Sequence, residues 1–467
     1  MRKYLVFLIV VLPLFIAQIG STAVTVAFPA MVSYFNTSLV LSGWVLNIYI
    51  LVTIGTIPLT SKLSDNVGRR FTFVLCVVLF TAGSLLCSIA PNIGWLILFR
   101  AIQGVGGGGF VSSVTGIVSD LFPKNRQRLI GLMVSVSTFG SIAGPGVGGV
   151  MVEYLGWQSV FWLNVPFGII VLVLAWLFVQ ADVKGTKHSE MDFVGIGILL
   201  SFASAMVLAV TFVDKAYNVS LILIVLMALL GIGLLIIFIR RSKTNSRAVF
   251  SREMLTSRPF LAANIFNLAY GAYGEMGIVS LLPLYAVSVY GMTTVESGLI
   301  TIPRSIGLFI LSIFASLSIM KWGYRRPIII GTLFMAVGIL LLSLEPGRMN
   351  VLGIELSPMV LIMFFNLIIG IGGGLVNPTS NNACIDLMPE HSASIAGLRQ
   401  ICRRIGQTIG IAICTVVLEF STSKAAGFTV LFVSFTAMMM VSMVAVFWMP
   451  ARPVASYHPS RRVVTAR

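Results

Sequence analysis

The stretch GSIAGPGVGG, residues 140–149, interrupts an otherwise apolar segment of the chain. It holds five glycines and one proline, and both residue types weaken helices in water. In lipid they weaken a helix less, and small side chains let two helices approach closely. Gly140, Gly144 and Gly148 recur every four residues and form one smooth stripe, and Pro145 loosens the backbone beside it. The stretch therefore predicts a membrane-spanning helix with a surface for close packing and bending.

The composition of the chain requires lipid as its main solvent. Of its 467 residues, 57% are hydrophobic and only 10% are charged, whereas a soluble domain carries about 25% charged residues. We therefore expect an all-α polytopic membrane protein. The five cysteines form no CxxC pair and the three histidines lie far apart, so no metal site is predicted. The chain has no GxxxxGK(S/T) loop, so we expect no nucleotide, no cofactor and no enzymatic chemistry.

A helix that spans lipid needs about 20 apolar residues, and this length can be used to locate the spans. The first apolar segment continues to about residue 30, which favours a retained helix over a cleaved signal sequence. Because the number of spans is even, both termini are expected on one side. The fourteen predicted spans are 4–30, 42–61, 71–90, 93–118, 128–152, 159–180, 192–213, 219–240, 259–288, 297–320, 327–345, 357–383, 394–418 and 426–449.

The 31 lysines and arginines divide unevenly between the two sides of this topology. Nearly all of them fall on the side of the termini, and this bias marks the cytoplasmic side. It predicts a multi-pass protein of a bacterial-type plasma membrane and explains the net charge of +16 without a nucleic-acid partner. Lys215, Arg348 and Lys424 are predicted on the outer side. Arg100 and Arg304 are predicted within spans. The residues assigned to the cytoplasmic side include Arg399, Arg403 and Arg404.

The two halves of the sequence resemble each other. SKLSDNVGRRF at 61–71 has a degraded partner in SIMKWGYRRP at 318–327, and RAIQGVGGGGF at 100–110 resembles NLIIGIGGGLV at 366–376. The pairs occur in the same order, which indicates two six-helix units with an inserted helix pair. The predicted parts are an N-terminal bundle at 1–180, inserted helices and linkers at 181–258, a C-terminal bundle at 259–450 and a basic cytoplasmic tail at 451–467.

Five motifs in order resemble the major facilitator superfamily, and specifically its fourteen-span drug:proton antiporter family. SKLSDNVGRR matches the pattern G-x-L-(A/S)-D-x-x-G-R-(R/K) except at Ser61, and LFRAIQGVGGG at 98–108 is built on R-x-x-Q-G. GSIAGPGVGG matches the antiporter pattern G-x-x-x-G-P-x-x-G-G at every fixed position, Gly149 included. WQSVFWLNVPFG at 157–168 and LPLYAVSVYGMTTVESGLITIP at 282–303 also look like this family. The resemblance implies a major facilitator fold and export. We expect the glycine stripe to lie against a helix of the other bundle.

The loop at 61–71 supplies a candidate latch at the cytoplasmic ends of the helices. Gly68 permits a tight turn, and Asp65 can accept hydrogen bonds from the start of the next helix or pair with Arg69. The resemblance adds Asp120 as a second acid near Arg69, and Arg70 completes the group. Such a cluster would join neighbouring helices and break as the two bundles rock. Alternatively, the two arginines only mark the cytoplasmic side.

Charged residues within spans are costly and indicate function. By resemblance Arg100 belongs to the proton-coupling machinery together with Asp65, and a structural role is the alternative. Glu275 is the acid predicted deepest in a span, where burial would let it exchange protons near neutral pH. It could also receive a cationic substrate. Arg304 lies at a similar depth, so a static Glu275–Arg304 ion pair remains open.

Polar and aromatic side chains in the spans are candidates to line a substrate cavity. The resembling family carries an acid in its first span, but Gly20 stands in that place here, which puts dicationic substrates in doubt. The cavity candidates are Gln18, Thr22, Thr25, Asn264, Asn267, Tyr270, Tyr273, Glu275, Arg304, Asn366, Asn377 and Gln407.

These observations together predict a proton-coupled antiporter that exports lipophilic small molecules or drugs by alternating access. Its partners are protons, the substrate and membrane lipids, and we expect a monomer. A lipid or amphiphile translocase of the same fold, with or without proton coupling, is the alternative.

Overall fold

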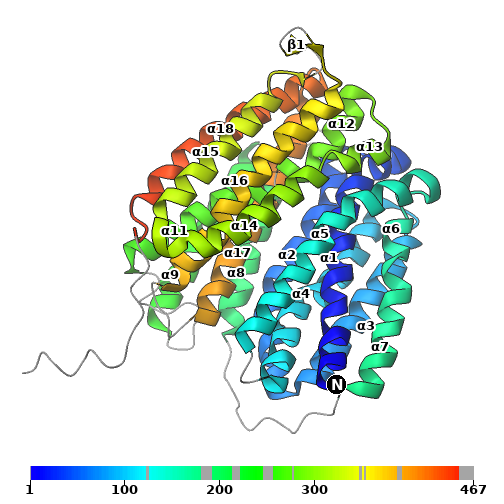
Figure 1. Ribbon diagram of the computed structural model, residues 1–467, viewed down its shortest axis with the longest axis vertical. Helices are drawn as coiled ribbons and strands as arrows, with labels where there is room; N and C mark the ends of the chain where they lie inside the picture. The colour runs from blue at the N-terminus through cyan, green and yellow to red at the C-terminus, as the bar shows by residue number, and fades with distance from the viewer. Residues whose placement is uncertain are drawn as a thin grey trace, which may run out of the picture.

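In the computed structural model, helices run side by side in two groups, one formed by α1–α7 and one by α11–α18 (Figure 1). We call these groups the N-terminal half and the C-terminal half. The near end of the molecule is the end where α1 begins, at the bottom of Figure 1, and the far end is the end where α1 ends. The structure describes residues 2–122, 126–179, 192–212, 221–245, 256–275, 278–346, 350–351, 354–386 and 392–451. The side chains of Asp65 and Glu275 lie outside this description.

Side-chain caps and one glycine turn define several boundaries in the N-terminal half. The side chains of Ser38 and Asn92 accept hydrogen bonds from backbone N–H groups in the first turns of α2 and α4, as helix-capping residues do. Gly68, before α3, has a φ of 130°, a conformation that glycine adopts readily and that agrees with the predicted tight turn. The helices of this half are α1 (Arg2–Phe35), α2 (Leu39–Asn66), α3 (Arg69–Ser88), α4 (Ile93–Leu121), α5 (Arg126–Leu155), α6 (Ser159–Trp162) and α7 (Asn164–Phe178).

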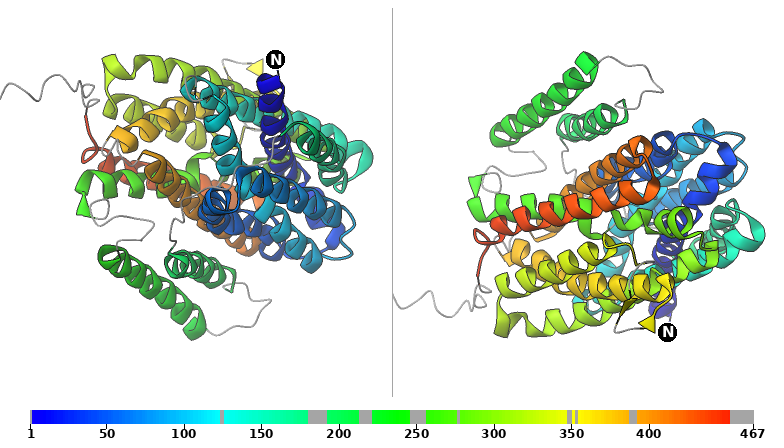
Figure 2. Two further views of the ribbon diagram at one scale, coloured as in Figure 1. Left: turned by 90° about the horizontal axis from the view of Figure 1, so that it is seen from below. Right: turned by 90° about the horizontal axis from the view of Figure 1, so that it is seen from above.

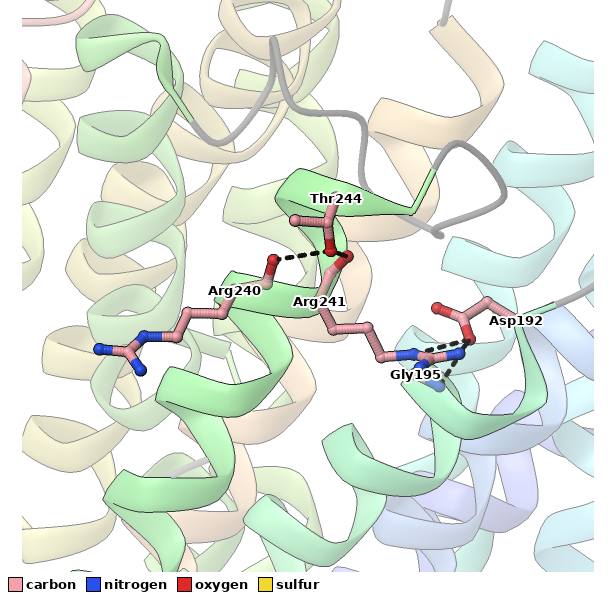
Figure 3. Close-up of polar contacts among 5 residues, drawn as sticks. All are labelled: Asp192, Gly195, Arg240, Arg241 and Thr244. Carbon is pink, nitrogen blue, oxygen red and sulfur yellow. Dashed lines mark hydrogen bonds and ion pairs between the residues drawn. The ribbon is translucent and has the colours of Figure 1, made fainter.

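An inserted helix pair stands beside the two halves (Figure 2). The buried Asp192 carboxylate joins its two helices, because Oδ1 accepts hydrogen bonds from Gly195 N at 2.9 Å and from Arg241 Nη2 at 3.0 Å (Figure 3). The first helix of the pair contacts α2 and α17, and Trp44 Nε1 of α2 donates to Thr211 Oγ1 at 3.1 Å. This helix therefore touches both halves. The pair consists of α8 (Phe193–Thr211) and α9 (Leu221–Thr244).

The C-terminal half begins with an interrupted helix where the sequence predicts one span over 259–288. A π-helical turn follows α11, and a 3-10 turn precedes α12. A Cβ on Gly271 would collide with the Arg403 carbonyl of α17, and Pro283 in the first turn of α12 lacks a backbone donor. The elements are α11 (Arg258–Tyr270), η3 (Gly271–Glu275), η4 (Ile278–Leu281), α12 (Leu282–Tyr290), α13 (Thr294–Leu299), α14 (Ile302–Trp322), α15 (Arg325–Leu342), β1 (Asn350–Val351), β2 (Ile354–Glu355), α16 (Pro358–Asp386), α17 (Ser392–Phe420) and α18 (Lys424–Val446).

Glycine-rich helices pack in the same manner in both halves. Gly104 and Gly106 of α4 lie against α2 and α3, and Gly370 and Gly372 of α16 lie against α14 and α15. Each glycine brings its helix backbone close to a neighbour, as small residues do in membrane proteins. The equivalent contacts support the internal repeat predicted from the two glycine-rich motifs.

The fold is all-α apart from the short antiparallel pair β1–β2. Helices occupy each of the fourteen predicted ranges, and 11 helices among the described residues are long and apolar enough to cross a membrane. By that measure α5, α8 and the interrupted segment α11–α12 are not among the 11. The molecule is thus a multi-pass helical membrane protein, and the count of fourteen spans stays a prediction.

The buried apolar residues form two large clusters among the described residues. One cluster lies at the near end of the N-terminal half and includes Val10, Phe73 and Phe110. The other joins the far end of that half, for example Phe28, to residues of the C-terminal half such as Tyr285. The two halves therefore share a core at the far end, whereas the near end of the N-terminal half has a core of its own.

The predicted partner of the glycine stripe is wrong. A Cβ on Gly140 would lie 2.7 Å from Phe15 O, and one on Gly148 would lie 2.7 Å from Ala23 Cα. Gly144, between them, also lies on α1. The stripe therefore packs α5 against α1 inside the N-terminal half, because residues four apart share one face of a helix.

The adjacent face of α5 is the one that meets the C-terminal half. A Cβ on Gly149 would lie 3.1 Å from Thr294 O and from Val295 Cα of α13. In return, a Cβ on Gly298 of α13 would collide with the Pro145 carbonyl. The motif thus makes two contacts, and Pro145, Gly146 and Gly149 are its residues that lie at the junction between the halves.

Candidate functional site

Arg100 of α4 lies in a buried polar network within the N-terminal half. Its side chain is 3% exposed, and its Nε donates to Val45 O at 3.0 Å while Nη1 donates to Gln103 Oε1 at 2.6 Å. Gln103 Nε2 continues the chain to Ser84 Oγ at 2.7 Å. The guanidinium carbon stands 4.5 Å from the Tyr49 ring centroid, in a cation–π contact. Neutral groups and a π face thus hold this charge, and no described carboxylate pairs with it.

The near-end cluster predicted as a latch is present in part. Arg69 Nε contacts Asp120 Oδ2 at 2.5 Å, and Arg70 Nη2 donates to Trp176 O at 2.9 Å. These contacts join α3 to α4 and α7, all within the N-terminal half. Asp65 lies outside the described side chains, so its part in the latch stays a prediction.

Arg304 of α14 reaches the π-helical turn at the interrupted helix. Its Nη2 donates to Gly274 O at 3.2 Å, one residue before Glu275. The Glu275 side chain lies outside the description, so neither its proton-carrier role nor its ion pair with Arg304 is tested. π-turns are frequent at functional sites, and this one coincides with the acid that the sequence singles out.

Three arginines of α17 that the count of basic residues assigns to the cytoplasmic side lie within a candidate span. Arg399 and Arg403 are 4% and 8% exposed, and all three residues lie within the candidate span Leu398–Phe420. Their positions within the predicted span 394–418 were the available signal. The count of cytoplasmic charge overrode it. The three residues are Arg399, Arg403 and Arg404.

The α17 arginines meet Asn377 and Tyr270, two of the predicted cavity residues. Arg399 Nη2 donates to Asn377 Oδ1 at 2.8 Å and to its carbonyl at 3.0 Å, and Arg403 Nη1 donates to Asn377 Oδ1 at 3.2 Å. The Arg403 guanidinium carbon stands 5.7 Å from the Tyr270 ring centroid. The Tyr270 hydroxyl is buried and has no hydrogen-bond partner.

Several other cavity candidates are engaged in helix-to-helix bonds. Asn267 Oδ1 accepts from Ser380 Oγ at 2.8 Å, Asn366 Nδ2 donates to Ile300 O at 2.9 Å, and the Tyr273 and Ser442 hydroxyls lie 2.9 Å apart. These bonds favour a structural role. The remaining candidates are half-buried and include Gln18, Thr22 and Thr25 on α1, Asn264 on α11 and Gln407 on α17.

Two carboxylates at the far end join the halves. Glu153 Oε2 of α5 accepts a hydrogen bond from Thr294 N, the first residue of α13, at 2.9 Å. Glu419 Oε2 of α17 accepts one from Leu39 N, the first residue of α2, at 2.8 Å. Free N–H groups and a partial positive charge mark helix N-termini, so each carboxylate is well placed there. Neither residue could be identified from the sequence, because a lone acid near a span end matches no motif.

Both the architecture and the sequence match a known family. Residues 10–411 match the model of the Major Facilitator Superfamily, and the chain belongs to that superfamily. Its members are membrane transporters rather than enzymes, and a multi-pass helical chain of this kind is consistent with a plasma-membrane protein.

The relatives differ in the substrates that their names state. The chain is 30% identical over 415 residues to the multidrug transporter protein MdtP of Bacillus subtilis, covering 88% of this chain and 74% of the relative. It is 28% identical over 417 residues to the riboflavin transporter RibZ of Clostridioides difficile, covering 88% and 87%. Multidrug resistance protein 3 of Bacillus subtilis is 28% identical over 386 residues, with 82% and 73% covered.

Solved structures share the fold at low identity. A POT family transporter in complex with 5-aminolevulinic acid superposes with a TM-score of 0.68 at 17% identity, covering 94% of this chain and 95% of that one. The inward-open xylose transporter XylE from E. coli gives a TM-score of 0.66 at 12% identity, covering 97% and 98%.

Proposed function

We propose that this protein exports lipophilic small molecules in exchange for protons by alternating access. The observation that carries the proposal is the unequal joining of the two halves. At the far end they share a core and two carboxylate–helix contacts, whereas the near end of the N-terminal half has a separate core. Breaking the far-end contacts while the near end closes would move a binding site from one side of the membrane to the other.

The direction and the substrate class rest on further support. With the near end cytoplasmic, as the distribution of basic residues predicts, the halves meet on the outer side and substrate enters from the cytoplasm. The glycine motif on α5 resembles that of antiporters, and two of the relatives carry multidrug names. Glu275, Arg100 and Asp65 are the residues we propose for proton coupling.

The test is dye efflux from proteoliposomes that contain the full chain. A panel of rhodamine 123, Nile red and fluorescein covers positive, zero and negative charge on lipophilic dyes. We expect at least one dye to leave against its gradient when a pH gradient is imposed, and to stop when the gradient is collapsed. Gradient-independent movement of spin-labelled phospholipid alone would instead identify a lipid translocase and contradict the proposal.

A single substitution tests the proton step. Glu275→Gln should abolish gradient-driven efflux and leave the thermal unfolding temperature unchanged. Glu296→Gln is the matched control, because Glu296 lies in the exposed capping box of α13 and glutamine preserves such a box. Equal efflux by wild type and Glu275→Gln would remove Glu275 from the mechanism.

A further inference from the structure

The α17 arginines lie deep along a helix that crosses the membrane. Arg399 and Arg404 are the second and seventh residues of the candidate span Leu398–Phe420, so Arg404 lies roughly 9 Å inside its start. Charges at such depth are expensive and face a partner or a water-filled site. This position separates them from the basic residues that only mark the cytoplasmic boundary.

A neutral amide, that of Asn377, accepts hydrogen bonds from two of these arginines. Asn377 supplies the oxygen atoms that accept from Arg399 and Arg403. An amide oxygen satisfies a donor but does not neutralise a cation. Among the side chains that the structure describes, no carboxylate forms an ion pair with Arg399 or Arg404. Among the described side chains, the charges of Arg399 and Arg404 are therefore not neutralised, and a charge in a medium of low dielectric constant is costly.

Unused hydrogen-bond donors gather at the same place. Nε of Arg399, Nε of Arg404 and the Tyr270 hydroxyl are buried and have no hydrogen-bond partner among the described residues. Tyr270 is fully buried, and its ring centroid lies 5.7 Å from the Arg403 guanidinium carbon. Buried donors without acceptors are uncommon in native proteins and call for an explanation. A bound anion would satisfy them and neutralise the charge together.

The group also faces the junction between the two halves. Tyr49 of α2, whose ring centroid lies 4.5 Å from the Arg100 guanidinium carbon, belongs to the helix against which α17 packs. Since α2 and α17 pack against each other, the helix that carries Arg404 lies at the junction of the two halves. A transporter that moves its halves about a bound substrate needs such a position.

We propose that Arg399, Arg403 and Arg404, with Tyr270, bind the acidic group of an anionic amphiphile. The acidic group is a carboxylate, sulfonate or phosphate, which accepts charge-assisted hydrogen bonds from guanidinium groups. This inference rests on the proposed transport function and narrows its substrate class. It reverses the expectation of a cationic substrate that Glu275 alone suggests.

The test measures equilibrium binding without any gradient. The full chain is placed in phosphatidylcholine nanodiscs, and fluorescence anisotropy follows two dyes that share a xanthene core, anionic fluorescein and cationic rhodamine 123. We expect fluorescein to bind and rhodamine 123 to bind at least about tenfold more weakly. Equal or tighter binding of rhodamine 123 would overturn the proposal.

Variants connect the binding to the arginines. Arg399→Gln and Arg404→Gln should each weaken fluorescein binding by about tenfold, whereas Arg240→Gln, the same change at an exposed position of α9, should not. If the arginine variants do not fold, Asn377→Asp retains the acceptor oxygen and adds a negative charge. It should weaken fluorescein binding and preserve the fold. Binding by Asn377→Asp and by the arginine variants equal to wild type would overturn the proposal.

Two further arms separate the possible sources and the two hypotheses. Phosphatidylglycerol in the nanodiscs should compete with fluorescein if lipid headgroups occupy the site. Undiminished fluorescein binding supports a free anionic substrate. Fluorescein binding without proton-driven efflux of any dye would support this site and contradict the exporter proposal. Proton-driven efflux of rhodamine 123 without fluorescein binding would support the exporter proposal and contradict this anion site.

Discussion

Glu153 and Glu419 hold equivalent places in the two halves of the molecule. Each carboxylate stands near the C-terminal end of its helix and accepts a hydrogen bond from the first residue of a helix in the opposite half, at 2.9 and 2.8 Å respectively. The internal repeat relates α5 to α17 and α2 to the α13–α14 segment, so the two contacts are related as well. We interpret them as a symmetric pair of clasps that hold the far end closed.

The clasps predict a shift in conformation when both are removed. A carboxylate at a helix N-terminus contributes about 0.3–1 kcal/mol when exposed, so Glu153→Ala with Glu419→Ala should favour opening of the far end by about tenfold. Spin labels at the exposed far-end positions 34 and 344, in a background without the native cysteines, would report the change as longer distances by double electron–electron resonance. Unchanged distance distributions would show that the shared core alone holds the halves.

The two faces of α5 predict different effects for bulky substitutions. Gly148→Leu would push α5 from α1 within one half, so we expect a loss of stability of about 1–3 kcal/mol and a lower thermal unfolding temperature. Gly149→Leu would push α5 from α13 and should impair transport more than stability. Gly146→Ala is the control, because the nearest atom to its new Cβ would be 3.4 Å away. Equal destabilisation by Gly148→Leu and Gly149→Leu would contradict this division.

The Arg100 network predicts that the role of the Arg100 charge in transport can be separated from the role of its hydrogen-bond partner Gln103. Arg100→Gln removes the charge and should abolish transport, with a stability loss of about 1–3 kcal/mol from buried groups left without partners. Gln103→Leu removes the link to Ser84 but keeps the charge and the bond to Val45, so it should retain part of the transport rate. Transport rate and thermal unfolding temperature, measured on the same preparations, decide whether transport depends on the charge or on the network. A transport rate in Gln103→Leu as low as in Arg100→Gln would make the network, rather than the charge, essential.

The near-end ion pair should matter little for stability. Arg69 and Asp120 have side chains that are 29% and 60% exposed, and such pairs contribute at most about 1 kcal/mol. Asp120→Asn should therefore leave the unfolding temperature nearly unchanged. If the pair acts as a latch, the same variant alters the transport rate several-fold. An unaltered rate would leave Arg69 as a marker of the cytoplasmic side.

Much of the fold could be predicted from the sequence, because lipid imposes long apolar helices and duplicated motifs give the order of the halves. The interruption of the helix at Gly271 could not be predicted, since Gly271 packs against α17, which lies more than a hundred residues away in the sequence. The prediction of which helix the glycine stripe faces was wrong for a related reason. A stripe shows that a helix is approached closely and says nothing of which neighbour approaches.

The candidate site also has parts that could be predicted from the sequence and parts that could not. Arg100 could be singled out because an intramembrane arginine is conspicuous, and its motif resembles a known one. Arg399, Arg403 and Arg404 were assigned to the cytoplasmic side, because several arginines near the end of a span are typical of cytoplasmic loops. Only the packing of Asn377 and Tyr270 around them distinguishes a buried group from a boundary marker.

The most direct test of proton-coupled export is proton movement driven by substrate. Proteoliposomes are prepared without a pH gradient, with pyranine trapped inside, and an outward gradient of a transported dye is imposed. Exchange predicts that protons enter as the dye leaves, so the internal pH falls in wild type and stays constant in Glu275→Gln. Dye efflux by wild type with no change of internal pH would contradict the exchange of protons for substrate.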